Sequence, residues 1–214
     1  MLHPTKTPLV YLITDGKATS NNFKKDSERI LNLVSAAVSS GVSIIQIREK
    51  KLDAREVFEL TLRAAKITKN TATLLLVNDR ADLALAAEAD GVHLTAKSLP
   101  ARIIRRSFPA NFTIGVSTHS SGEVLTAGEH GADFAVFSPI FYSPNKGEAL
   151  GTEKLREICT MAAGFPIIAL GGIDQTNFQS ALRAGAKGIA AIRFLNDADK
   201  LPQIMDKIRN AQKS

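Results

Sequence analysis

The feature that most constrains the fold of this chain is an alternation between short apolar segments and longer amphipathic ones. The short segments are apolar almost throughout, which is typical of parallel strands covered on both faces. They lie at residues 9–14, 43–48, 73–78, 91–94, 113–117, 134–138, 167–170 and 188–192. The stretches between them, such as 29–39, carry apolar residues at helical spacing. Eight strand–helix units in 214 residues leave about 27 residues for each, which is enough for a (β/α)8 barrel.

We therefore predict an α/β fold, a single-domain TIM barrel over residues 1–214. Its barrel core is expected at about 9–195 and a C-terminal helix at about 197–211. Asp53, Ser98 and Asp174 are predicted as helix N-caps. The alternative is a doubly wound open sheet. Its dinucleotide-binding form is disfavoured because no Gly-x-Gly-x-x-Gly motif follows the first strand.

Charge and composition favour a small anionic ligand over a nucleic acid or a membrane. The net charge is +6, but aromatic residues make up only 6% and tryptophan is absent, so little is available to stack on bases. No apolar run approaches the roughly 18 residues of a membrane helix, and the first residues lack the apolar core of a secretory signal. With a single cysteine, Cys159, these features predict a cytoplasmic protein.

Polar side chains follow most of the predicted strands, at the edge where such barrels carry their active sites. In the second strand, Gln46, Arg48 and Lys50 fall on one face at a spacing of two. A guanidinium and an ammonium on the same face form a clamp for phosphate or diphosphate. The alternative is an ion pair at the strand end, with Glu49 solvated.

Three further groups follow later strands. Asp79, after Asn78, suits a Mg²⁺ ligand or a helix cap. The Gly171-Gly172 pair offers backbone N–H groups to an anion, as does the backbone around 191–193, although a glycine pair can also simply form a tight turn. His119 suits a general acid or base, or a structural histidine.

Two more features belong to this edge. Residues 141–150 form a long connection that contains Lys146 and has the character of a lid. His93 is predicted to have a structural role at the barrel wall.

The order of these motifs resembles the thiamin phosphate synthase/TenI superfamily. The motifs are Gln-x-Arg-x-Lys, Asn-Asp-Arg, Asp-Gly-Val-His-Leu, Gly-Val-Ser-x-His, Gly-Ala-Asp-Phe, a Pro-x-Phe…Lys loop and Leu-Gly-Gly-Ile. Each is unspecific alone, but their order and spacing from residue 11 to about 195 are specific. The resemblance implies a TIM barrel of thiamin biosynthesis. It also implies a transferase that joins hydroxymethylpyrimidine diphosphate to thiazole phosphate and releases diphosphate.

Carried over by position, the resemblance assigns roles to the candidate residues. Arg48, Lys50 and Lys146 would act on the diphosphate, and Asp79 would bind Mg²⁺. The groups that would bind substrate are Gln46, Asn78, Ser117, Ser143, Asn145, Gly171, Gly172, Ile192 and Arg193. The implied partners are small phosphorylated substrates, and a homodimer is possible.

The chain also departs from the synthase pattern. Synthases usually have Gln-x-Asp after His-Leu, with the Asp as a second Mg²⁺ ligand, whereas this chain has Thr95-Ala96-Lys97-Ser98. We hypothesise that the Lys97 ammonium replaces part of the metal's charge. The lid has Ser143-Pro144-Asn145-Lys146 in place of Thr-x-Thr-Lys, and Arg193 or a neighbour stands where a serine is usual.

These departures resemble the TenI branch, a metal-free thiazole tautomerase whose catalytic histidine corresponds to His119. Asn78-Asp79 and Lys50 favour the synthase. A third alternative is a non-catalytic protein that binds thiazole phosphate.

Overall fold

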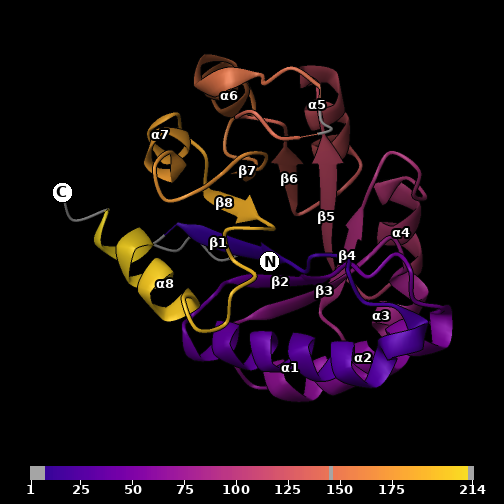
Figure 1. The fold of residues 1–214 in the computed structure, drawn as a ribbon. Coiled ribbons are helices and arrows are strands. Elements are labelled where there is room, and N and C mark those ends of the chain that lie inside the picture. Colours follow the sequence, from indigo (N-terminus) through magenta and orange to yellow (C-terminus); the bar gives the residue numbers. More distant parts are fainter. Residues whose placement is uncertain (1–7, 145–146, 212–214) are drawn as a thin grey trace.

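The computed structural model describes residues 8–144 and 147–211, and these residues form a closed barrel of eight parallel strands in sequence order (Figure 1). The strands are β1 Leu9–Ile13, β2 Ile44–Ile47, β3 Leu74–Asn78, β4 Gly91–Leu94, β5 Thr113–Thr118, β6 Phe134–Phe137, β7 Ile167–Ala169 and β8 Gly188–Ala191. The barrel closes where β1 pairs with β8, with Leu9 opposite Gly188. The predicted (β/α)8 barrel is confirmed, and the doubly wound alternative is wrong because the sheet has no open edge.

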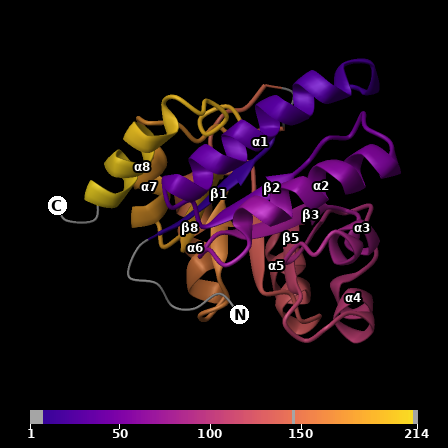
Figure 2. The same cartoon turned by 90° about the horizontal axis from the view of Figure 1, so that it is seen from below.

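Helices follow the strands and surround the barrel. They are α1 Phe23–Ser39, α2 Ala54–Thr68, α3 Ala81–Ala86, α4 Ala101–Ser107, α5 Ser121–Glu129, α6 Gly151–Met161, α7 Phe178–Arg183 and α8 Leu201–Asn210, with a 3₁₀ turn at Ser20–Asn22. Figure 2 shows α8 beside α1, next to the pair of strands that closes the barrel. Within the described residues, no helix is both long and apolar enough to cross a membrane.

Two separate cores explain why the strands are apolar on both faces. Alternate strand residues, among them Tyr11 and Phe134, fill the interior of the barrel. Their neighbours, such as Leu12 and Ala135, pack outward against the helices. Burying both faces of a strand is the arrangement that a parallel sheet requires.

One of the three predicted N-caps is confirmed. Asp53 caps α2, since its carboxylate accepts the N–H of Glu56 at 2.8 Å and the Glu56 side chain accepts the N–H of Asp53 at 3.0 Å. Ser98 was wrongly predicted, because α4 begins only after Pro100 and the Ser98 hydroxyl bonds to Asp79 instead.

The Asp174 prediction was also wrong. The helix α7 begins after Asn177, which is its N-cap residue. Asp174 lies in the turn that precedes the helix, where its carboxylate accepts the N–H of Thr176 at 2.8 Å.

Candidate active site

A cavity of about 650 Å³ opens at the carboxyl ends of the strands. This volume is within the usual range for small-molecule sites. The predicted site residues that line it are Gln46, Arg48, Lys50, Asn78, Ser117, His119, Ser143, Gly171, Gly172, Ile192 and Arg193. Asp79 is not among the lining residues, and Asn145 and Lys146 lie outside the described residues. Residues from the ends of all eight strands therefore meet around one space.

The end of β2 has the geometry that a spacing of two predicts. Gln46, Arg48 and Lys50 all face the cavity. Glu49 faces the other way and is buried, with 4% of its surface exposed. Its carboxylate accepts the N–H groups of Gly16 at 3.3 Å and Ala18 at 2.9 Å. The reading of Glu49 as a solvated residue is wrong, because the β1–α1 connection folds over it.

The electrostatic character of the cavity is one-sided. Four lining side chains carry positive charge, those of Arg48, Lys50, Lys97 and Arg193, and no Asp or Glu is among the lining residues of the described chain. A concave site with charges of one sign concentrates the field and attracts ligands of the opposite charge. The sequence suggests Lys97 only as a substitute for part of the metal's charge. In the structure Lys97 is one of the residues that line the cavity.

A buried pair lies next to the cavity: Gln46 lines it, and Tyr11 is fully buried in the barrel interior. The Gln46 side-chain amide donates to the Tyr11 hydroxyl at 2.6 Å. Burial raises the pKa of the Tyr11 hydroxyl, and the bond from Gln46 offsets this only in part, so Tyr11 stays protonated. The amide of Gln46 is thereby fixed in one orientation beneath the ligand space.

His93 also lines the cavity, and sequence reasoning had placed it only at the barrel wall. Its Nε2 is 2.8 Å from the Ser117 hydroxyl, and its ring contacts those of Tyr11 and Phe134. Burial lowers the pKa of His93 to about 4, with a smaller lowering by Arg48 that Asp79 opposes. The imidazole is therefore neutral near pH 7 and supplies no positive charge to a ligand.

His119 follows β5 and faces the cavity. Its Nδ1 lies 2.8 Å from the carbonyl oxygen of Ser138, which can only accept, so Nδ1 is the donor. In the neutral ring, Nε2 then carries the lone pair. This arrangement suits a base that faces a ligand.

The glycine pair after β7 packs directly against the β6–α6 connection. A side chain on Gly172 would collide with the carbonyl oxygen of Tyr142, and one on Gly171 would lie 2.7 Å from Cα of Pro139. Both glycines have positive φ, 101° at Gly171 and 63° at Gly172. The backbone of the turn therefore forms the cavity wall here, beside Tyr142, whose surface is 78% exposed.

Asp79 does not have the surroundings of a metal ligand. Its Oδ1 accepts from the Thr95 hydroxyl at 2.9 Å, the Thr95 N–H at 3.2 Å and the Ser98 hydroxyl, and its Oδ2 accepts from the Asn78 amide at 2.7 Å. Partial burial raises the pKa of Asp79, but the bonds from Ser98, Thr95 and Asn78 outweigh it and the pKa lies below its usual value.

These contacts allow a test of whether a Mg²⁺ ion fits. A Mg²⁺ ion is held by oxygen ligands that point toward it, whereas three protein donors converge on Asp79 Oδ1, one bonds to Oδ2 and Asp79 does not line the cavity. Among the residues described, no three His, Cys, Asp or Glu side chains gather where they could hold a metal. The side chains at this point of the structure do not fit a Mg²⁺ site.

Fold and site together define a (β/α)8-barrel protein with a cationic cavity suited to small phosphorylated ligands. The chain belongs to the thiamine monophosphate synthase family, whose model matches residues 10–195.

Sequence and structure comparisons agree on this family. The chain is 34% identical over 208 residues to the thiamine-phosphate synthase of Caldanaerobacter subterraneus, covering 96% of this chain and 94% of that protein. It is 35% identical over 203 residues to the thiamine-phosphate synthase of Chloroflexus aurantiacus, covering 94% and 90%. The solved thiamine phosphate pyrophosphorylase of Pyrococcus furiosus superposes with a TM-score of 0.79 at 29% identity, covering 96% of this chain and 95% of that one.

Proposed function

We propose that this protein is a thiamin phosphate synthase. It couples 4-amino-5-hydroxymethyl-2-methylpyrimidine diphosphate to thiazole phosphate and releases diphosphate. The observation that carries the proposal is the meeting of Arg48 and Lys50 with Gly171, Gly172 and the backbone of residues 192–193 around one cavity. This gives one anion-binding wall for each of the two phosphorylated substrates.

The reaction needs positive charge where a bond breaks. The C–O bond to the pyrimidine methylene breaks, and the electron pair leaves with the diphosphate. The thiazole nitrogen then donates its lone pair to the resulting cation and forms the new C–N bond. Fixed cations stabilise the charge that develops on the leaving group, and Arg48, Lys50 and Lys97 line the described cavity.

The other side chains select and orient the substrates. Gln46, Asn78, Ser117 and Ser143 present amide and hydroxyl groups to the pyrimidine side of the cavity. Gly171, Gly172, Ile192 and Arg193 bind the thiazole phosphate. Two residues of the lid lie outside the described residues: Lys146 is proposed to act on the pyrimidine diphosphate, and Asn145 is proposed to line the pocket.

The direct test is an assay of the purified protein with both substrates, in excess Mg²⁺ and in a chelator. Formation of thiamin phosphate together with diphosphate is the expected result. If neither condition gives product while both substrates bind, the synthase proposal fails. The two conditions also test Asp79, since a ligand role for its carboxylate requires that chelation stop turnover.

His119 supports a second candidate, a thiazole tautomerase that works without metal. His119 lines the cavity, and Nδ1 is committed to the Ser138 carbonyl oxygen, which leaves Nε2 as the ring nitrogen that can accept a proton. A base at this position can move a proton on a thiazole carboxylate phosphate. The test is proton exchange on the thiazole ring, measured by NMR in deuterated buffer. Exchange that disappears in His119→Ala supports the tautomerase, and unchanged exchange in that variant excludes it.

A further inference from the structure

The connection between β4 and α4 holds Lys97 in a short, internally bonded turn at residues 95–98. The Thr95 N–H donates to the Ser98 hydroxyl oxygen at 2.7 Å, and the Ser98 N–H donates to the Thr95 carbonyl at 3.0 Å. Thr95, Ala96 and Lys97 all line the cavity. The backbone that carries the Lys97 side chain is therefore fixed, although the side chain itself is exposed.

Asp79 fastens this turn to the end of β3. Its carboxylate receives the hydroxyl groups of Thr95 and Ser98. Its own N–H donates to the His93 carbonyl at 2.9 Å. It has a φ of 61°, a conformation that aspartate adopts more readily than most residues. Asp79 thus crosslinks the ends of two neighbouring strands below Lys97.

The charged side chains around the turn at residues 95–98 also favour an anionic ligand. No Asp or Glu is among the described residues that line the cavity, and protein donors bond to both oxygens of the Asp79 carboxylate. Lys97 lines the cavity together with Arg48 and Lys50, and these residues follow β4 and β2, which both pair with β3. Fixed side-chain cations can neutralise a diphosphate without a metal.

We propose that the Lys97 ammonium takes the place of a divalent metal ion in binding diphosphate, and that Asp79 is the positioning residue for the turn that carries it. The inference depends on the proposed function only for the identity of the ligand. It predicts that the protein binds diphosphate in the complete absence of divalent metal.

The experiment is calorimetric titration of the full chain with inorganic diphosphate in EDTA, repeated with excess Mg²⁺. Wild-type protein should bind in EDTA, and Mg²⁺ should leave the affinity unchanged or lower it, because it neutralises the ligand before binding. Lys97→Ala should lose affinity roughly tenfold in EDTA, the effect of removing one charged contact. Lys97→Arg should recover most of it.

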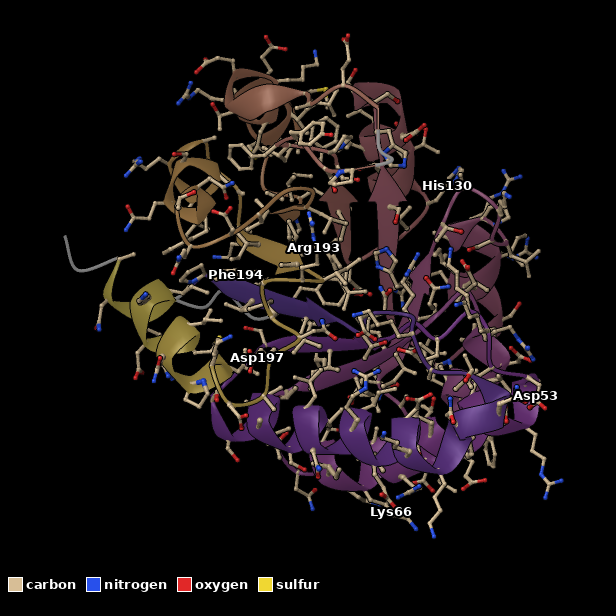
Figure 3. The ribbon with its side chains drawn as sticks, in the orientation of Figure 1. Asp53, Lys66, His130, Arg193, Phe194 and Asp197 are labelled. Carbon is tan, nitrogen blue, oxygen red and sulfur yellow. The ribbon has the colours of Figure 1, made fainter. Side chains whose placement is uncertain are left out.

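Lys66→Ala is the matched control, since it removes one lysine from helix α2. Figure 3 shows Lys66 at the outer edge of the helices, away from Arg193. This control should bind as wild type does. Asp79→Asn should weaken binding in EDTA and in Mg²⁺ alike, whereas a metal ligand at this position would affect only the titration with Mg²⁺.

Two results would overturn the inference: binding that requires Mg²⁺, or an affinity in EDTA that Lys97→Ala leaves unchanged. The synthase assay is read separately. If diphosphate binds as described but no thiamin phosphate forms, the proposed function fails and the inference stands. If product forms only with Mg²⁺ and Lys97→Ala does not lower the rate, the inference fails and the function stands.

Discussion

The two sides of the cavity are built to hold an anion by different means. On the side of β2 to β4, long side chains carry full charges, and the anchors beneath them are carboxylates such as Glu49 and Asp79. On the side of β7 and β8, the glycine pair Gly171-Gly172 brings backbone to the wall, and Arg193 is the one charged side chain among the described lining residues there. The first side can change its ligand chemistry through single substitutions. The second depends on a backbone path that few other residues can follow.

The largest effect on activity is expected from a substitution on the β2–β4 side of the cavity. Arg48→Ala should lower kcat/KM for the synthase reaction by about 10²–10³-fold, because it removes a fixed cation from the developing charge of the leaving group. Steady-state kinetics with each substrate varied in turn would measure this. Arg48→Lys should recover only part of the rate, since an ammonium does not form the two parallel bonds of a guanidinium. Equal rates for Arg48→Ala and wild type would remove Arg48 from the leaving-group site.

His93, which is buried beneath the cavity, should make the stability of the folded protein depend on pH. The pKa of His93 is about 4 in the folded protein, below the ordinary value near 6.5. The unfolded chain therefore gains this proton first as the pH falls. Stability should be fully present above about pH 6.5 and fall by up to about 3 kcal/mol between there and pH 4.

Urea unfolding at a series of pH values measures this contribution. His93→Gln cannot titrate in this range and should show a correspondingly shallower fall between pH 6.5 and 4. Parallel curves for the two proteins would show that the histidine is not held neutral by burial.

On the β7–β8 side of the cavity, Gly172→Ala should lower the free energy of unfolding by about 1–3 kcal/mol. The reasons are the positive φ of Gly172 and the collision of the new side chain with the Tyr142 carbonyl. We expect KM for thiazole phosphate to rise about tenfold or more while diphosphate affinity changes little, because the distortion is confined to one wall. Calorimetry with each ligand separates the two effects. Gly122→Ala in α5 is the matched control, since a side chain there meets nothing within 4 Å.

The smallest effect is expected from Glu49→Gln. One of the two backbone N–H groups of Gly16 and Ala18 would lose its acceptor, which costs about 1–2 kcal/mol. Thermal unfolding would report the loss of stability, and diphosphate affinity should fall slightly through the neighbouring Arg48. An effect on thiazole phosphate alone would contradict the division of the cavity into two halves.

Much of this arrangement could be predicted from the sequence because it depends on local periodicity. Apolar runs placed all eight strands, and the spacing of two placed Gln46, Arg48 and Lys50 on the cavity side. The cap at Asp53 also depends only on residues three positions apart. Such features need no knowledge of what lies across the fold.

The rest depends on contacts between distant segments. The Asp79 carboxylate is occupied by residues 16 and 19 positions further along the chain, so its surroundings could not be predicted from Asn78-Asp79 alone. The same contact explains why Ser98 does not cap a helix. Glu49 is buried by the connection that follows β1, which lies more than 30 residues earlier.

The exposed Tyr142 has a practical consequence for every titration of this protein. The chain contains no tryptophan and only two tyrosines. Tyr11 is buried within the barrel, whereas Tyr142 stands in solvent with its carbonyl against Gly172. In a measurement of intrinsic fluorescence, a quencher in solution can therefore reach Tyr142 but not Tyr11. Acrylamide quenching would follow the approach of a ligand to the β7 side without any attached dye.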